Sequence, residues 1–182
     1  MIARTLVELE AGLEQIRRSP SDDGTLRLIV RRPAVDRREL LETAQLDTNQ
    51  GLVGDSWQAR GSSATADGSS DPEAQVTLMN VRVATLLAGS PDAGSAAGDQ
   101  LYVDFDLAEA NLPAGTRLTV GDAVLEVSAK PHTGCAKFSS RFGLDALRFV
   151  STREGRELRL RGLNARVVRG GTIGLGDRIS KA

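Results

Sequence analysis

The sequence has 182 residues, the usual length of one domain, and is 40% hydrophobic and 26% charged, as in soluble globular proteins. No apolar run approaches the roughly 18 residues that a membrane span needs, which argues against a membrane protein. The single cysteine, Cys135, excludes an internal disulfide. Because the N-terminal stretch also lacks the pattern of an export signal, we expect a cytoplasmic protein.

The net charge of −1 hides an uneven distribution. Residues 130–182 carry twelve lysines and arginines against four acids, a charge of +8, so residues 1–129 carry −9. A basic region of this kind favours an anionic ligand, although it is also consistent with a solvated basic face. Only six residues are aromatic and they form no stacking motif, so we expect no binding to nucleic acid.

The first half of the chain gives mixed signals. Residues 3–18 have the apolar spacing of an amphipathic helix, and residues 25–33 resemble a strand. Residues 34–50 are ambiguous, GLVGD at 51–55 indicates a turn, and residues 56–73 have the composition of a loose loop. Asp55 of that turn is a candidate to orient a ligand hydroxyl or to hold an arginine.

The second half predicts alternating strands and turns. Residues 75–79 indicate a strand, Asn80 is placed to cap a helix that ends at Gly89, and residues 90–99 again have the composition of a loose loop. Residues 101–107 alternate as a half-buried strand does. Residues 116–129 predict a tight hairpin, residues 138–152 a helix, and the glycine-punctuated C-terminal stretch several short strands. The pattern predicts a mainly β fold, with a barrel-like core and peripheral helices.

The segment AKPHTGCAKFSSRFG (129–143) contains the only cysteine and the only histidine, His132. Cys135 precedes a predicted helix whose first turns carry Lys137 and Arg141, and such surroundings favour the thiolate, the form that attacks sulfur and binds soft metals. The same cations would suit a phosphate. The alternative is that Cys135 is a small buried hydrophobe and that His132 caps a turn. Further along, LNARVV (163–168) places Asn164 and Arg166 on one side of a strand, where they can grip an anion or form a surface pair.

These segments together resemble the MOSC domain, named after the C-terminal domain of molybdenum cofactor sulfurases. The resemblance covers most of residues 25–182, leaving residues 1–24 as a helical extension. It rests on five stretches: GLVGD (51–55), QVTLMN (75–80), LYVDFDLAEANLPAGTRLTVGDAVLEVSAKPHTGCAKF (101–138), RFGLDAL (141–147) and LNARVVRGGTIGLGD (163–177).

The resemblance implies a β-barrel with peripheral helices and a role for Cys135 as a sulfur carrier or molybdenum ligand. It implies molybdenum cofactor (molybdopterin) as ligand, with Cys135 and His132 as reactive groups and Lys137, Arg141, Asn164, Arg166 and Asp55 as cofactor-binding candidates. A cysteine desulfurase or an electron-donor protein would be the partner. Pyridoxal phosphate belongs to relatives with a desulfurase domain, and we do not expect this chain to bind it.

Three functional interpretations remain open from the sequence. The first is binding of molybdenum cofactor or carriage of sulfur on Cys135. The second is a molybdenum-dependent reductase of N-hydroxylated compounds, which needs a separate electron donor because the chain has no flavin or iron–sulfur motif. The third is a binding or adaptor module without catalytic activity, in which the cysteine is structural.

Overall fold

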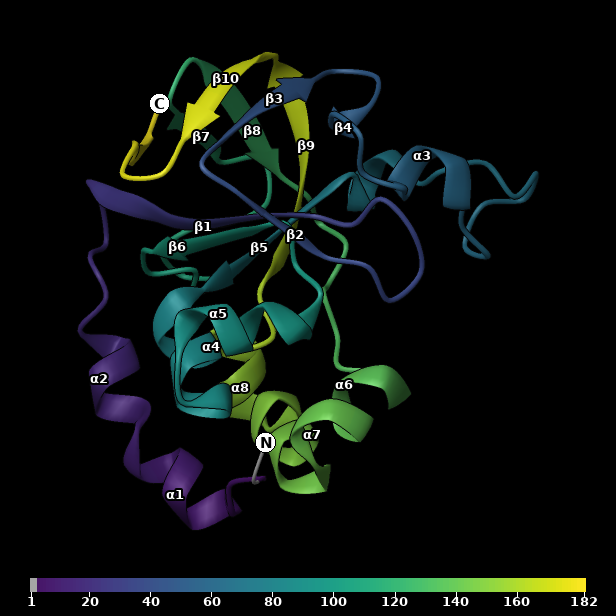
Figure 1. Ribbon diagram of the computed structural model, residues 1–182. Helices are drawn as coiled ribbons and strands as arrows, with labels where there is room; N and C mark the ends of the chain where they lie inside the picture. The colour runs from purple at the N-terminus through teal and green to yellow at the C-terminus, as the bar shows by residue number, and fades with distance from the viewer. Residues whose placement is uncertain (1–2) are drawn as a thin grey trace.

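The computed structural model describes residues 3–182, and its centre is a closed β-barrel (Figure 1). Seven strands follow one another around it in the order β11-β7-β8-β9-β5-β6-β1, and pairing of β1 with β11 closes the ring. Among the strands of residues 3–182, β5 and β6 are the one pair that is parallel. The barrel strands are β1 (Gly24–Arg31), β5 (Val76–Asn80), β6 (Leu101–Asp104), β7 (Arg117–Val120), β8 (Ala123–Val127), β9 (Leu163–Arg169) and β11 (Arg178–Lys181). The predicted mainly β barrel is therefore confirmed.

The other strands lie outside the ring. β2 (Glu39–Leu41) extends the sheet beyond β1, while β3 (Thr43–Asp47), β4 (Gly51–Leu52) and β10 (Gly171–Gly174) form a separate three-stranded sheet. From the sequence, residues 34–50 were consistent with either a strand or a helix. In the structure this stretch contains the strands β2 and β3.

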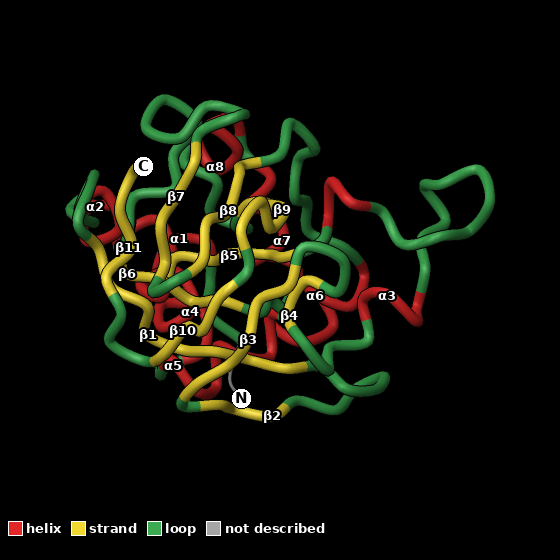
Figure 2. Tube along the Cα trace, turned by 90° about the horizontal axis from the view of Figure 1, so that it is seen from above, coloured by secondary structure: helices red, strands yellow, loops and turns green. Residues whose placement is uncertain are grey.

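Most helices gather on one side of the barrel (Figures 1 and 2). They are α1 (Leu6–Ala11), α2 (Leu13–Arg17), α3 (Trp57–Arg60), α4 (Val81–Ala88), α5 (Pro91–Gly94), α6 (Ala136–Phe142), α7 (Leu144–Ser151) and α8 (Arg153–Glu157), with the 3₁₀ turns η1 (Pro72–Ala74) and η2 (Ser95–Ala97). None of the helices in the described part of the chain is long and apolar enough to cross a bilayer.

Strand alternation divides the buried side chains between two cores. Leu101 and Val103 of β6 belong to the core inside the barrel, whereas Tyr102 between them belongs to the core between barrel and helices. β1 supplies both cores in the same way, with a register shift between Leu26 and Leu28. Each of these strands thus has two buried faces, as expected for a barrel covered by helices.

Glycine explains where the predicted helix at 138–152 is interrupted. Gly143 has φ +93° and ψ 167°, a conformation that side-chain-bearing residues rarely adopt, and it separates α6 from α7. The N-terminal helix is similarly divided at Gly12, where a Cβ atom would lie 2.6 Å from the Leu86 side chain of α4. The apolar periodicity continues through both breaks, so periodicity alone did not reveal them.

The local predictions around β5 and the hairpin are confirmed. The Asn80 side chain accepts a hydrogen bond from Arg82 N at the start of α4, and Gly89 ends the helix in the left-handed conformation. β7 and β8 form the predicted hairpin, with Val120 opposite Ala123 across the Gly121-Asp122 turn.

Residues 90–99 are more ordered in structure than their composition suggested. They form α5 and η2, and Asp99 at their end is fully buried. Residues 61–71, in contrast, make mostly local contacts and project from the body beyond α3 (Figures 1 and 2). The division at residues 24/25 and the mobility of both loops stay predictions.

The first prediction tests the hairpin as barrel core. Leu125 of β8 is 0% exposed and belongs to the inner core, so Leu125→Ala is expected to lower the free energy of unfolding by ~2–5 kcal/mol in chemical denaturation. Val124, next to it, is only half-buried. Val124→Ala serves as the control with a smaller loss, and equal effects at the two positions would contradict the assignment.

The second prediction concerns the projecting loop. Gly61 and Gly68 meet at its base, since Ser62 N donates to Gly68 O at 3.4 Å. Deletion of residues 62–67 should therefore change the melting temperature by no more than about 2 °C, because exposed loop tips add little to stability. Thermal unfolding followed by circular dichroism measures the change, and a large drop would show that the loop stabilises the barrel.

Candidate functional site

A pocket of about 400 Å³, here called the Cys135 pocket, combines segments from six parts of the chain. They are the stretch after β1, the start and end of α3, the end of η1 with β5, the turn from η2 to β6, the segment from Lys130 into α6, and the start of β9 with the turn before it. Eight cationic residues line the pocket against one carboxylate, that of Asp36. The cations are Arg32, Arg37, Arg38, Arg60, Lys130, Lys137, Arg141 and Arg161. So strong an excess of positive charge favours an anionic ligand.

Cys135 lies at this pocket as the N-cap residue of α6. Its backbone is extended, with φ −129° and ψ 177°, and its side chain makes no capping hydrogen bond. The residue is exposed. The interpretation of Cys135 as a buried structural residue is therefore wrong, and the thiol is available for chemistry.

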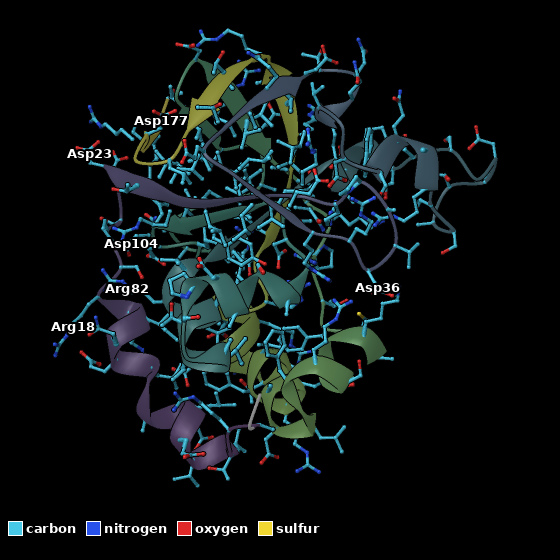
Figure 3. All side chains as sticks on the ribbon, viewed as in Figure 1. Arg18, Asp23, Asp36, Arg82, Asp104 and Asp177 are labelled. Carbon is cyan, nitrogen blue, oxygen red and sulfur yellow. The ribbon has the colours of Figure 1, made fainter. Side chains whose placement is uncertain are left out.

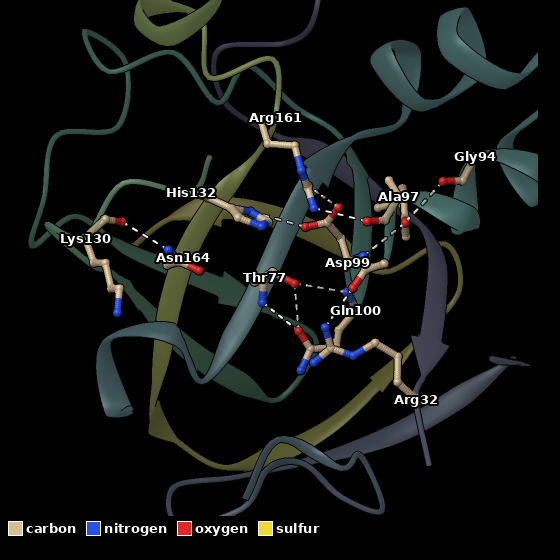
Figure 4. A network of polar contacts seen from close by, with 12 residues as sticks. Arg32, Thr77, Gly94, Ala97, Asp99, Gln100, Lys130, His132, Arg161 and Asn164 are labelled. Atoms are coloured by element: carbon tan, nitrogen blue, oxygen red, sulfur yellow. Dashed lines mark hydrogen bonds and ion pairs between the residues drawn. The ribbon is translucent and has the colours of Figure 1, made fainter. Parts of the chain in front are cut away.

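His132 faces a buried carboxylate instead of forming a hydrogen bond to the thiol. Its Nδ1 lies 3.3 Å from Asp99 Oδ1, although the contact lacks hydrogen-bond geometry, and neither atom has another partner among the described residues (Figure 4). Burial, and secondly the charge of Arg161, lower the pKa of His132 to about 4, against the opposing effect of Asp99. The imidazole is thus neutral near pH 7.

Arg161 anchors the same carboxylate from a second direction. Its Nη1 donates to Asp99 Oδ2 at 2.6 Å and its Nη2 to Ala97 O at 3.1 Å, while the guanidinium carbon lies 5.1 Å from the centre of the Phe138 ring of α6. Arg161, just before β9, therefore connects the start of β6 to the helix that carries Cys135. A cation over an aromatic face adds to this attraction.

Asp55 binds an arginine, the second of the two roles that the sequence suggested for it. Its side chain is 0% exposed, and both oxygens accept from the Arg32 guanidinium at 2.9 Å. Arg32 Nη1 also donates to Gly98 O at 2.7 Å. Asp55 itself does not line the pocket; it fixes Arg32, which does.

The remaining arginines are crowded together. Burial and the neighbouring Arg141 lower the pKa of Arg38, and burial and Arg32 lower that of Arg60. Arg38 Nε is buried without a hydrogen-bond partner in the described chain. Arg141 is held by Ala96 O at 3.0 Å and by Asp36, which is labelled in Figure 3. Because an anion would relieve this repulsion, the pocket is suited to bind one.

The structure gathers most of the candidate residues from the sequence but not all of them. Cys135, His132, Lys137, Arg141 and Asn164 line the pocket. Asn164 is buried there and donates from Nδ2 to Lys130 O at 3.1 Å.

Arg166 is the exception. It is exposed, does not line the pocket, and donates from Nε to Glu126 Oε1 at 3.1 Å on the neighbouring strand β8. Two residues along a strand advance the chain by about 7 Å, which carries Arg166 past the segment that covers Asn164. The predicted Asn164–Arg166 pair is thus not assembled in the pocket.

Sequence reasoning missed five residues that shape the site: Arg32, Arg38, Arg60, Asp99 and Arg161. Arg32, Arg38 and Arg60 belong to residues 1–129, whose net charge is negative, so the regional charge count concealed them. The doubled arginines at 31–32 and 37–38 were the only available signal.

The described residues contain no group of three or more His, Cys, Asp and Glu side chains placed to hold a metal ion. A metal ion in the pocket would therefore find one thiolate ligand, that of Cys135, among the described side chains. Any metal bound there needs further ligands from its own cofactor or from solvent.

The third prediction follows from the environment of His132. The pKa of His132 is about 4 in the folded protein and 6.5 in the unfolded protein. As the pH falls, His132 is therefore protonated in the unfolded state before it is protonated in the folded state. The contribution of His132 to stability is therefore full above pH 6.5 and falls by up to about 3 kcal/mol as the pH drops from 6.5 to 4.

Chemical denaturation across this pH range, compared with His132→Gln, isolates that contribution. The variant should lose less stability on acidification, since the carboxylates titrate in both proteins. Parallel curves for the two proteins would refute the depressed pKa.

Comparisons with known proteins agree with this architecture. The family model described as MOSC domain matches residues 81–180. No curated protein sequence matches the chain. Similar solved structures include the YuaD protein of Bacillus subtilis, with a TM-score of 0.62 and 17% identity over 86% of this chain and 93% of that one. YiiM of Escherichia coli has a TM-score of 0.56 and 16% identity, over 87% of this chain and 69% of that chain.

YiiM of Geobacillus stearothermophilus gives a TM-score of 0.54 with 14% identity, covering 89% of this chain and 73% of that one. At such identities the likeness concerns the fold. The family match spans more than half of the sequence, including the hairpin, the cysteine segment and the last barrel strands. The chain therefore belongs to the MOSC domain family.

Proposed function

We propose that this protein binds molybdenum cofactor in the Cys135 pocket and uses Cys135 either as a ligand to the metal or as a carrier of sulfur. The observation that supports this most directly is the exposed Cys135 thiol beside eight cationic side chains. A soft sulfur ligand and a binding site for an anionic group are the two features that such a cofactor requires.

The residues present fit an anionic cofactor of this kind. The volume of about 400 Å³ is within the range of small-molecule sites, roughly 300–1,000 Å³. The buried Arg38 Nε has no partner within the described chain and offers a donor, and Lys137 lines the pocket from the first turn of α6. When bound, the cofactor would supply a redox-active, sulfur-binding metal.

Each pocket residue then has a distinct role. Lys137, Arg38 and Arg141 attract and orient the anionic group, and Arg32, paired with Asp55, is a fixed guanidinium in the pocket wall. His132 is a weak base because its pKa is about 4, so we assign it to positioning the cysteine segment and not to taking the thiol proton.

In the sulfur-carrier role, the Cys135 thiolate attacks the outer sulfur of a persulfide donor. A new S–S bond forms on Cys135, the S–S bond of the donor breaks, and the donor cysteine leaves as a thiolate. A cysteine desulfurase is the class of protein that presents such a persulfide. The exposure of Cys135 supports this role over that of an adaptor with a structural cysteine.

The fourth prediction separates these roles by mutation. Cys135→Ser is expected to abolish sulfane sulfur loading or molybdenum retention with little change in melting temperature, because an exposed side chain is replaced by one of similar size. Arg38→Gln should weaken cofactor binding about tenfold, as expected on losing a charged hydrogen bond. Elemental analysis, cyanolysis and thermal shifts with added cofactor measure these effects.

Arg166→Ala is the matched control, because Arg166 is exposed and paired with Glu126 away from the pocket. It should bind cofactor as the wild type does. A wild-type protein that contains neither molybdenum nor sulfane sulfur, and gains no thermal stability from cofactor, would refute the proposal.

A further inference from the structure

A second cavity, of about 300 Å³, lies beside the Cys135 pocket and does not include Cys135. The residues that line both are Lys130, Pro131, His132, Thr133 and Arg161, which form the partition between them. The rest of the second cavity is bounded by Glu109, Gly134, the residues after β8, the end of α7, α8 and the turn into β9. We call it the Ser128 cavity after its most buried polar lining residue outside the partition.

Three residues that line this cavity, Ser128, His132 and Arg161, each have a buried polar atom without a hydrogen-bond partner among the described residues. Ser128 is 7% exposed and Arg161 is 6% exposed, and neither Ser128 Oγ nor Arg161 Nε has a hydrogen-bond partner in the described chain. Buried polar atoms are nearly always hydrogen-bonded, and an unpaired one costs about 1–3 kcal/mol. His132 Nδ1 faces Asp99 Oδ1 at 3.3 Å, whereas Ser128 and Arg161 share the lining of this cavity and have no such neighbour for these atoms. A ligand in the cavity is the group that would supply their missing contacts.

The cations around the cavity define the charge of that ligand. Arg156 of α8 is exposed and forms no ion pair with the described residues, whereas Lys130 pairs with Asp71. Burial lowers the pKa of Arg159, whose Nη1 donates to Leu112 O at 2.6 Å. With Arg161 these make four cationic residues against one acid, Glu109.

We propose that the Ser128 cavity is a second binding site, for a small molecule that carries a phosphate or carboxylate group. Arg161 Nε–H is a donor and the Ser128 hydroxyl can donate, so both are satisfied by acceptor oxygens of one anion. Arg156 supplies the unpaired charge at the exposed side. This site goes beyond the proposed function, since it neither contains nor needs Cys135.

The test is a titration of the ¹⁵N-labelled full chain with inorganic phosphate and, separately, with acetate at constant ionic strength. We expect saturable shifts of the Ser128, Gly155 and Gly162 amides, which lie at this cavity, when Cys135 is replaced by serine as well as in the wild type. Stronger binding of phosphate would identify a phosphorylated ligand, and stronger binding of acetate a carboxylate.

Two variants test the assigned contacts. Ser128→Ala and Arg156→Gln should each weaken binding at these amides by about fivefold or more. Arg153→Gln is the matched control, because Arg153 lies on the same helix, pairs with Glu157 and does not line the cavity.

Two outcomes would overturn the inference: no saturable shift at these amides with either anion, or unchanged affinity in both variants. Loss of molybdenum or sulfur chemistry at Cys135 leaves this result unaffected, so the two proposals fail separately.

Discussion

The buried carboxylate of Asp99 connects the barrel to the helices that carry the candidate site. It is 0% exposed and is bound by Arg161, while its own amide donates to the Tyr102 hydroxyl at 3.3 Å. Removing one partner of a buried ion pair commonly costs ~3–5 kcal/mol, because the remaining charge has no compensation. Asp99 therefore sets the position of three things together: the start of β6, the residue that leads into β9, and His132 before the cysteine.

This arrangement also explains how so many arginines can share one pocket. Arg32 is neutralised by Asp55 and Arg161 by Asp99, both behind the pocket wall with fully buried side chains. The paired arginines present fixed donors, and Arg38, Arg60 and Lys137 contribute charge without such buried partners. A pre-formed, positively charged wall attracts anions and needs little rearrangement to bind them.

The sequence predicted features that depend on neighbours along the chain. The hairpin at Gly121-Asp122, the Asn80 cap and the position of Cys135 before a helix all depend on residues within a few positions of one another, and all were correct. The barrel itself was predicted because its strands are short and separated by glycines, and because the motifs resemble the MOSC family. Periodicity failed at Gly143, since a break in backbone direction leaves the apolar spacing intact.

The pocket was only half predictable because it forms from distant segments. Nothing near Arg32 in sequence indicates that Gly98 and Asp55 will hold it, and the burial of Asp99 depends on packing around Tyr102. Arg166 was assigned to the site because strand alternation places it on the same side of β9 as Asn164. Alternation does not show that the segment at Lys130 contacts Asn164 while Arg166 contacts Glu126 instead. Such residues need the tertiary fold to be known.

The closure of the barrel has a consequence for biosynthesis. The ring closes where Gly24 of β1 pairs with Ile179 of β11, close to opposite ends of the sequence. While the ribosome makes the chain, β2 and β6 emerge well before β11, so the Gly24–Thr25 end of β1 has unpaired backbone groups until almost the whole sequence is made. Long-range pairing of this kind slows folding and exposes an edge to aggregation. The ring of this barrel is therefore completed only when β11, one of the last segments to be made, becomes available.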